Sequence, residues 1–449
     1  MRVFKIISFL CSTLFFIQPI YSSNDVKDEF REKLIKKGQS QIEAISSIKV
    51  LNREDLIPLL PEILRNSDSN ASVVTAIILL YKSYGVDIDK YHPKWTEDFE
   101  WILENDREES NYIEIFSFIE NRKERRLLYS LTNFLKYPVY SVRVSAYKAL
   151  GSLNDDRAIP FLFELGNSEN GILKKYYLES LVYFKDDRIL SLLPKLMSDP
   201  SPAIRSECVL VIEKLNLKEK YYTVSNMANS DLNYEVRKYS VTSLKNLYNK
   251  NKTYIFQKTI FDENSEVRNA TVEAIYMIRD PYYSRFISQA MEKEQITKLK
   301  LSMIETLIAL GNHGGGGGLI TTLKDDKSTE VRIRSAQAIA MLNVSSASQS
   351  LLTGLRYESQ NPVKLEIVRA LGALKEKNAV SILLDIIKAT SPNDLRKEAI
   401  LSLEKIDDPV VMPFLFDQID IENNLDIKNL LKTTLREMLY KYHSQKNKK

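Results

Sequence analysis

The chain has 449 residues, more than a single compact core usually contains, so several domains or a repeat array are expected. Hydrophobic residues make up 44% of it and charged residues 27%, while 13 glycines and 14 prolines are too few for a loop-rich or disordered chain. The net charge is only +4, which argues against the concentrated basic excess of a nucleic-acid-binding protein.

The first 23 residues have the pattern of an export signal. Arg2 and Lys5 precede an apolar run over residues 6–17, and two serines follow at residues 22 and 23. We therefore expect residues 1–23 to be a signal peptide and the protein to be exported, periplasmic or envelope-associated, with an uncleaved N-terminal anchor as the alternative. A lipid anchor is disfavoured because Cys11 lies inside the apolar run. We expect no membrane span after this segment.

Residues 24–135 have helical periodicity, for example over residues 73–84 and 112–119. They do not align with the repeat that follows them. We therefore expect a divergent helical N-terminal region that caps a repeat array.

A repeat of 31 or 32 residues occupies residues 136–443. Its anchor is a β-branched residue or leucine followed by Arg or Lys, and the ten anchors are Val142, Leu173, Ile204, Val236, Val267, Leu299, Val331, Val363, Leu395 and Ile427. Eight residues after every anchor stands Leu or Ile, and seven after it stands a small or β-branched residue. Apolar positions at 0, +4, +5, +8 and +11 form one stripe of an α-helix, and the small column lets a neighbouring helix approach closely.

A second helical pattern lies between successive anchored helices, as in residues 158–165 and 380–387. Each repeat is thus predicted to be a helical hairpin, and consecutive hairpins must stack because one hairpin cannot bury its apolar faces alone. We predict an all-α fold, an α-solenoid of about ten stacked hairpins, followed by a basic tail over residues 444–449. Lys432 interrupts the apolar +5 column of the last repeat, as expected of a polar C-terminal cap.

The segments Val142-Arg143, Ala149-Leu150-Gly151 and Ala370-Leu371-Gly372 resemble the HEAT-repeat family, most closely its short subclass first recognised in phycobilisome lyases. The resemblance covers about residues 136–443. It implies a HEAT-like superhelix whose anchored helices line a concave face. It implies little about function, since such repeats serve many unrelated partners.

Five consecutive glycines interrupt the array without changing its period of 32 residues, namely Gly314, Gly315, Gly316, Gly317 and Gly318. They therefore replace the loop and first turn of a second helix, where each glycine weakens a helix by up to about 1 kcal/mol relative to alanine. We predict a flexible hinge here. An anion site is the alternative, although a phosphate-binding loop would need a preceding strand and a Lys or a spaced glycine pattern, which this segment lacks.

Catalytic and metal-binding motifs are missing from the sequence. The histidines at 92, 313 and 443 lack the spacing of a zinc or iron site, and no P-loop, dinucleotide fingerprint or nucleophile elbow occurs. We expect no cofactor, no metal and no enzymatic activity. Acid pairs such as Asp155-Asp156 and Asp407-Asp408 fall at helix boundaries, where we expect them to cap backbone N–H groups. Cys208 is expected to be a buried, inert thiol.

The basic residue at +1 could form either a phosphate-binding stripe or a structural series of ion pairs. An acid lies five residues before the anchor in seven of the ten repeats, at Asp199, Asp231, Asp262, Glu294, Asp326, Glu358 and Glu422. Stacking brings the acidic and basic columns of neighbouring repeats together, so we predict ion pairs between repeats.

The resemblance places positions +2, +3 and +6 of each anchored helix on the concave face. These positions vary in charge and size and interleave Tyr and Leu with basic residues, a mixture typical of protein interfaces. The candidate partner-binding residues are Lys148, Lys175, Tyr176, Glu179, Lys238, Tyr239, Glu273, Glu305, Arg334, Gln337 and Arg369. The divergent N-terminal region is the alternative binding surface.

We therefore expect a non-catalytic scaffold or adaptor that binds a protein or peptide, and no nucleic acid, along the concave face in an extracytoplasmic compartment. Two alternatives remain open. The likeness to bilin lyases suggests a lyase-like enzyme or enzyme subunit, and the N-terminal segment suggests an envelope-anchored structural protein. The oligomeric state does not follow from the sequence.

Overall fold

The computed structural model describes residues 30–66, 70–168, 172–184, 186–248, 254–388 and 391–446, which form helices and turns without a β-strand. The all-α prediction is therefore confirmed for these residues. The predicted signal peptide, residues 1–23, lies outside them. The chain divides into two compact units, Met1–Val211 and Ile212–Lys449, called unit 1 and unit 2 below. Their boundary falls inside helix α14 (Pro202–Lys214).

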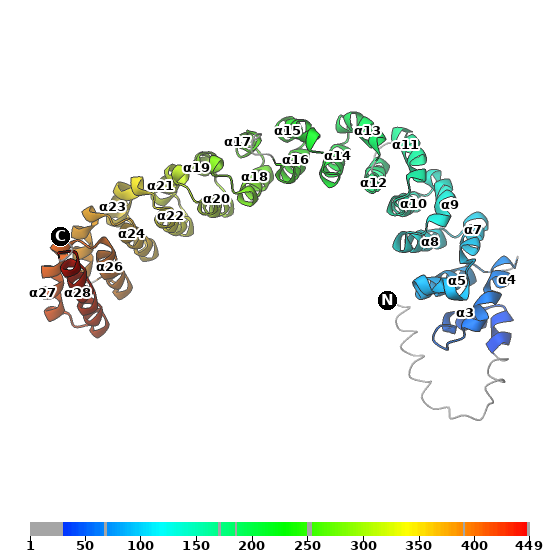
Figure 1. Cartoon of the computed structure of the whole chain (residues 1–449), viewed down its shortest axis with the longest axis horizontal. Coiled ribbons are helices and arrows are strands. Elements are labelled where there is room, and N and C mark those ends of the chain that lie inside the picture. The colour runs from blue at the N-terminus through cyan, green and yellow to red at the C-terminus, as the bar shows by residue number, and fades with distance from the viewer. Residues whose placement is uncertain are drawn as a thin grey trace, which may run out of the picture. The chain divides into compact units, whose positions relative to one another are not determined.

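Unit 1 is a stack of helical hairpins (Figure 1). Helices α3, α5, α8, α10 and α12 follow one another in one layer, while α4, α9 and α11 pair with α5, α10 and α12. The N-terminal region therefore continues the stacking of the repeats. The helices are α3 (Gln39–Ser47), α4 (Leu60–Arg65), α5 (Ala71–Tyr84), α6 (Ile88–Tyr91), α7 (Trp95–Asn105), α8 (Glu109–Arg122), α9 (Leu128–Thr132), α10 (Tyr140–Ser152), α11 (Ile159–Ser168), α12 (Ile172–Leu181) and α13 (Asp187–Met197).

Unit 2 has two layers of helices (Figure 1). The anchored layer contains α16 (Tyr234–Asn246), α18 (Ser265–Ile278), α20 (Thr297–Leu310), α22 (Thr329–Met341), α24 (Asn361–Ala373), α26 (Asn393–Ile406) and α28 (Leu425–Lys446). The second layer contains α15 (Tyr221–Ser230), α17 (Ile255–Thr259), α19 (Ser284–Lys293), α21 (Gly316–Asp325), α23 (Ser348–Tyr357), α25 (Val380–Lys388) and α27 (Met412–Ile421). Consecutive anchored helices contact each other, and each also packs on the second-layer helix before it.

The core consists of the predicted columns. Every anchor whose side chain is described is buried, and so is the +8 residue of every repeat from Leu150 to Leu403. The small residues of the +7 column allow neighbouring helices to approach closely. Ser402 on α26 is one of them, and a Cβ added to Gly372 on α24 would lie only 2.6 Å from its Oγ. The hairpin repeat and its core columns are therefore confirmed.

Side-chain caps begin many of the helices. Asn264 accepts a hydrogen bond from the backbone N–H of Glu266 at 2.8 Å, at the start of α18. Asp155 and Asp408 each accept one from the second residue after them, at 3.1 Å. The capping role predicted for the acid pairs is thus confirmed at these two positions.

One segment after residue 23 qualifies as a membrane span by length and composition, contrary to expectation. It is Ala71–Tyr91, which contains α5. Half of its most apolar window is buried in the protein, and core helices of soluble proteins pass the same test. The apolar side chains of α5, including Ile77, Ile78 and Tyr81, are part of the core of unit 1.

The last repeat does not end in the expected polar cap. Lys432 is exposed as predicted, but Leu435 is only half-buried, and Phe416 and Leu439 are exposed. Helix α28 continues to Lys446, so residues 444–446 of the predicted basic tail are helical, while residues 447–449 lie outside the described residues.

Candidate partner-binding face

Ion pairs connect anchored helices of unit 2 to the turn that precedes the next anchored helix. Arg237 donates from Nε to Asp262 Oδ2 at 2.7 Å and from Nη2 to Asp262 Oδ1 at 2.8 Å. Arg268–Glu294 and Arg332–Glu358 repeat this double hydrogen bond. Lys300–Asp326 and Arg396–Glu422 are single ion pairs at the same repeat positions, and Lys174–Asp199 is such a pair within unit 1. These pairs, called the ladder below, confirm the structural role predicted for the +1 and acidic columns.

Arg237, Arg268 and Arg332 of the ladder also hold the turn before their own helices. Arg237 Nη1 donates to the backbone carbonyl of Asp231 at 3.0 Å, and Arg332 Nη1 donates to that of Asp326 at 2.8 Å. The acid in turn accepts a backbone N–H of its own turn, as Asp262 Oδ1 does from Asn264 at 2.9 Å. Each of these three pairs therefore connects two consecutive turns through charge-assisted hydrogen bonds.

The carboxylates of Glu294 and Glu358 in the ladder remain charged at neutral pH. Burial alone would raise the pKa of Glu294, but hydrogen bonds from Arg268 and from the backbone N–H of Ile296 hold that pKa below its ordinary value. The same balance lowers the pKa of Glu358 opposite Arg332. The ladder thus fixes the spacing of the repeats with paired charges.

The exposed side of the anchored layer in unit 2, called the anchored face below, carries a second set of ion pairs. Arg334 on α22 donates from Nη2 to Glu305 Oε2 on α20 at 2.7 Å and from Nη1 to Gln337 Oε1 at 2.9 Å. Arg369 on α24 contacts Glu366 at 2.6 Å and Glu398 on α26 at 2.9 Å. The structure therefore brings three of the candidate residues, Glu305, Arg334 and Gln337, into one cluster.

The charged side chains that α16 and α18 contribute to the anchored face also have partners within the chain. Lys238 Nζ lies 2.6 Å from Glu266 Oε2 and 5.6 Å from the centroid of the Tyr239 ring. Glu273 accepts a hydrogen bond from Asn269 at 2.7 Å. The charged candidate residues of unit 2 are thus already engaged within the chain, so a partner would not meet a row of free charges.

Exposed apolar side chains alternate with these charged groups. Tyr239 is 38% exposed, Met277 65% and Met341 62%, and Tyr276 and Leu401 are also exposed. Met277 and Met341 stand four residues after the +6 positions Glu273 and Gln337, on the same side of their helices. The candidate positions +2, +3 and +6 do not include these methionines. Position +10, which lies one helical turn after +6, would have included both.

The candidates in unit 1 lie on two neighbouring helices. Lys148 is exposed on α10, and Lys175 and Glu179 form an i, i+4 ion pair on α12 with an Nζ to Oε1 distance of 3.9 Å. Tyr176 is on α12, but its side chain lies outside what the structure describes. These residues remain candidates for partner binding.

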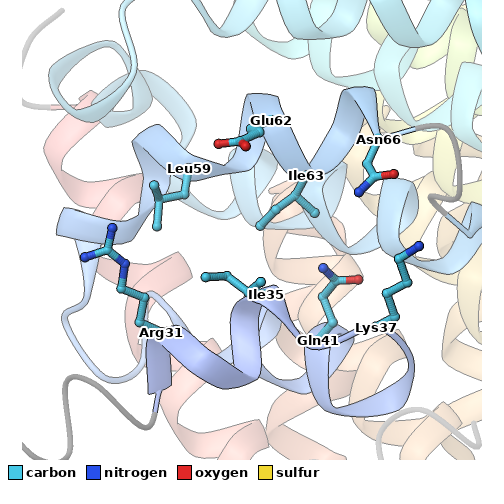
Figure 2. A pocket seen from close by; sticks show the side chains of 8 residues that line it. All are labelled: Arg31, Ile35, Lys37, Gln41, Leu59, Glu62, Ile63 and Asn66. Carbon is cyan, nitrogen blue, oxygen red and sulfur yellow. The ribbon is translucent and has the colours of Figure 1, made fainter.

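The N-terminal region, the alternative binding surface, contains a pocket of about 220 Å³ (Figure 2). Ile35 and Ile63 lie between the two helical segments that form its walls, and charged side chains lie around them. Its eight lining residues are Arg31, Ile35, Lys37, Gln41, Leu59, Glu62, Ile63 and Asn66. The pocket is small, so it suits a single side chain better than an extended segment.

A buried polar cluster in unit 1 was not foreseen from the sequence. Asp98 on α7 is almost fully buried and accepts from Arg65 at 2.8 Å and from the Tyr81 hydroxyl at 2.8 Å. Its Oδ2 also lies 2.7 Å from His92 Nε2. Burial and the Asp98 charge together raise the pKa of Tyr81 well above its ordinary value. The cluster connects three helices, because Arg65 lies on α4, Tyr81 on α5 and Asp98 on α7.

The glycine run forms the 3-10 helix η8 (His313–Gly315) and the first turn of α21, as the constant period predicted. Its packing is close. A Cβ added to Gly318 would lie 2.6 Å from the backbone oxygen of Ser288, and one added to Gly315 would lie 2.5 Å from the Leu307 side chain. These contacts give the glycines a packing role. The flexible hinge remains a prediction.

Within the part of the chain that the structure describes, no group of three or more His, Cys, Asp or Glu side chains is arranged to hold a metal ion. Cys208 is fully buried, as expected, and burial raises the pKa of its thiol. The anchored face carries paired charges and exposed Tyr, Met and Leu side chains.

Comparison with known proteins agrees with this architecture. Residues 317–404 and 348–436, both in unit 2, match the family model for HEAT repeats. A comparison with curated proteins found no match. Among solved structures, Kap121p bound to RanGTP is similar with a TM-score of 0.55 and 13% identity, covering 95% of this chain and 54% of that chain. The karyopherin Kap121p bound to the extreme C-terminus of the protein phosphatase Cdc14p has a TM-score of 0.53 and 13% identity, covering 94% and 53%.

The chain is an all-α solenoid of stacked helical hairpins, with HEAT repeats matched over residues 317–436. Its sequence matches that family in unit 2, and its fold resembles karyopherin solenoids over most of its length. It spans about half the length of those karyopherins. A solenoid of stacked hairpins exposes an extended surface.

Proposed function

We propose that this protein is a non-catalytic scaffold or adaptor that binds a protein or peptide along the anchored face in an extracytoplasmic compartment. The observation that carries the proposal is the exposure of Tyr239, Met277 and Met341 between internally compensated ion pairs. Tyrosine is frequent in interface hot spots, and methionine adapts its shape to a partner. In HEAT-type solenoids the extended concave surface is the usual binding surface.

The compensated charges define what kind of partner would fit. A strongly charged ligand would have to break pairs such as Glu305–Arg334, whereas an amphipathic segment can cover the apolar side chains and leave these pairs intact. An amphipathic helix or extended peptide is therefore the favoured ligand. Among the similar solved structures, Kap121p is bound to Ste12p in one and to RanGTP in another.

Photo-crosslinking in the native cell tests the proposed surface. A photoreactive phenylalanine analogue replaces Met341 on the anchored face and, as the matched control, Tyr357 at the end of second-layer helix α23, which is also highly exposed. We expect a discrete crosslinked protein or peptide from position 341 and not from position 357. Equal products at both positions, or products from position 357 alone, would exclude the anchored face as the binding surface.

The compartment is proposed on the signal pattern of residues 1–23. Cell fractionation with N-terminal sequencing tests it, and the expected result is a protein outside the cytoplasm that begins shortly after residue 23. Recovery with the membrane fraction and an intact N-terminus would favour the envelope-anchored alternative. A cytoplasmic protein with an intact N-terminus would contradict export.

A lyase-like enzyme of the short, phycobilisome-lyase-like subclass is the alternative function. It rests on repeat columns that serve packing in this structure, such as Gly372 against Ser402. Pigment that copurifies with the protein, detected by its absorption spectrum, would favour this alternative over the scaffold.

A further inference from the structure

An open apolar groove lies between the last two helices, α27 and α28. Its volume is about 450 Å³, and it is lined by Phe416, Ile419, Asp420, Lys432, Leu435, Arg436 and Leu439. Phe416 is 62% exposed and Leu439 40%. Apolar side chains gathered in this way on a folded protein commonly mark an interaction surface.

The groove exposes positions that the other repeats bury. The +8 residue is at most 1% exposed in the repeats from Leu150 to Leu403. In the repeats from Leu244 to Leu403, a following anchored helix packs on the helix that carries it. In the last repeat the +8 residue, Leu435, is half-buried. The groove therefore has the surface chemistry of a repeat interface without a helix packed on it.

Helix α28 adds to this surface. It has 22 residues, whereas the anchored helices α16 to α26 have 13 or 14. Tyr440 and Tyr442, both exposed, lie on the additional turns next to Leu439. The extra length therefore widens the apolar surface.

The charges around the groove indicate its occupant. Asp420 stands on α27, and Lys432 and Arg436 stand on α28. Among the described residues, none of these three side chains forms an ion pair within the chain, in contrast to the compensated charges of the anchored face. The two walls of the groove therefore carry opposite charges, with the acidic wall on α27 and the basic wall on α28.

We infer that this groove is the interface between two copies of the chain. A two-fold axis along the groove places α27 of each copy against α28 of the other. Asp420 then meets Lys432 and Arg436 of the second copy, and this contact occurs twice because the interface is isologous. Phe416 and Ile419 are covered by Leu435 and Leu439 of the second copy. The inference is independent of the function of the anchored face.

Charge exchange tests this pairing directly. Sedimentation equilibrium of the full chain is expected to show a dimer, and Asp420→Lys alone or Lys432→Glu with Arg436→Glu is expected to raise the dimer dissociation constant by about tenfold or more. All three residues are exposed, so these variants should fold, which circular dichroism verifies. The control Val410→Glu changes an exposed apolar residue outside the groove and should leave the dimer unchanged.

Mixing the two charge variants distinguishes pairing from general disruption. An Asp420→Lys copy and a Lys432→Glu/Arg436→Glu copy have complementary charges at both contacts, so the mixture should form heterodimers with near wild-type affinity. A wild-type chain that stays monomeric, including one that instead binds a different protein through this groove, would overturn the inference. So would a dimer that the charge variants do not weaken, or a mixture that stays dissociated.

Discussion

Arg237 and Asp262 form a doubly hydrogen-bonded ion pair across two successive repeats, with N–O distances of 2.7 and 2.8 Å. Both side chains are largely buried, and Arg237 also donates to the carbonyl of Asp231. The pair is one unit of the ladder. The ladder holds consecutive turns in register without adding free charge to the anchored face.

Loss of one ladder arginine should destabilise unit 2 strongly. Arg237→Ala leaves Asp262 buried without its partner, which costs about 3 kcal/mol. The neighbouring pair Lys238–Glu266 is more exposed, so Lys238→Ala should cost less than about 1 kcal/mol. Urea unfolding monitored by circular dichroism measures both. Equal losses for the two variants would mean that the ladder is no more important than a surface pair.

Acid should weaken the stack through the ladder carboxylates. The pKa values of Glu294 and Glu358 are lowered in the folded protein from an ordinary value of 4.5. A depressed folded-state pKa stabilises the fold fully above the unfolded pKa, and this contribution is lost as pH falls through the lower folded pKa. Unfolding free energy should therefore decrease below about pH 4.5.

The matched control for this pH dependence removes the cause of the shifts. In an Arg268→Gln/Arg332→Gln variant the carboxylates lose their cationic partners. Stability should then be lower at pH 7 and should fall less steeply between pH 5 and 3, a range set by the ordinary Glu pKa. The same slope in both proteins would show that other groups cause the acid sensitivity.

Two substitutions in the glycine run distinguish a packing role of these glycines from a hinge role. Gly318→Ala would place a Cβ 2.6 Å from the Ser288 backbone oxygen and should destabilise the protein by about 1–3 kcal/mol. Gly317→Ala meets nothing closer than 3.6 Å and should stabilise α21 by up to about 1 kcal/mol. Thermal unfolding compares them. Stabilisation by both substitutions would leave only the hinge explanation for these glycines.

The buried cluster around Asp98 should be essential for the N-terminal region. Asp98→Asn removes the negative charge that faces Arg65 and His92, and breaking such a buried pair costs about 3 kcal/mol. Asp87→Asn, which affects only an exposed pair with Lys90, is the control and should leave the unfolding midpoint unchanged. Similar midpoints for the two variants would contradict a structural role of the cluster.

The fold of the repeats could be predicted because packing imposes one residue class at a fixed interval. Leu150 and Leu403 occupy the same buried position in different repeats, and the acidic and basic columns give the ladder directly. The N-terminal region stacks in the same way without these columns. Its core contains large aromatic side chains such as Trp95, Phe99 and Phe118, which pack edge to face. Irregular aromatic packing has no period to detect.

The pairing of the candidate face's charged side chains within the chain was not predicted from the sequence. Glu305 at +6 pairs with Arg334 at +3 of the next repeat, while Arg369 at +6 pairs with Glu398 at +3. The two pairs have opposite polarity, so neither column shows a constant charge. Reversing the charge of Arg334 or Arg369 would therefore break contacts between repeats as well as contacts with a partner. The exposed apolar side chains are better positions for testing binding.

The affinity of the crosslinked partner for defined variants tests the central claim most directly. Isothermal titration compares the wild-type chain, a Tyr239→Ser/Met277→Ser/Met341→Ser variant, and a Tyr222→Ser/Tyr357→Ser/Val410→Ser control whose exposed residues lie in the second layer and its turns. We predict an affinity loss of about tenfold or more for the first variant and none for the control. Equal affinity of all three proteins would contradict partner binding along the anchored face.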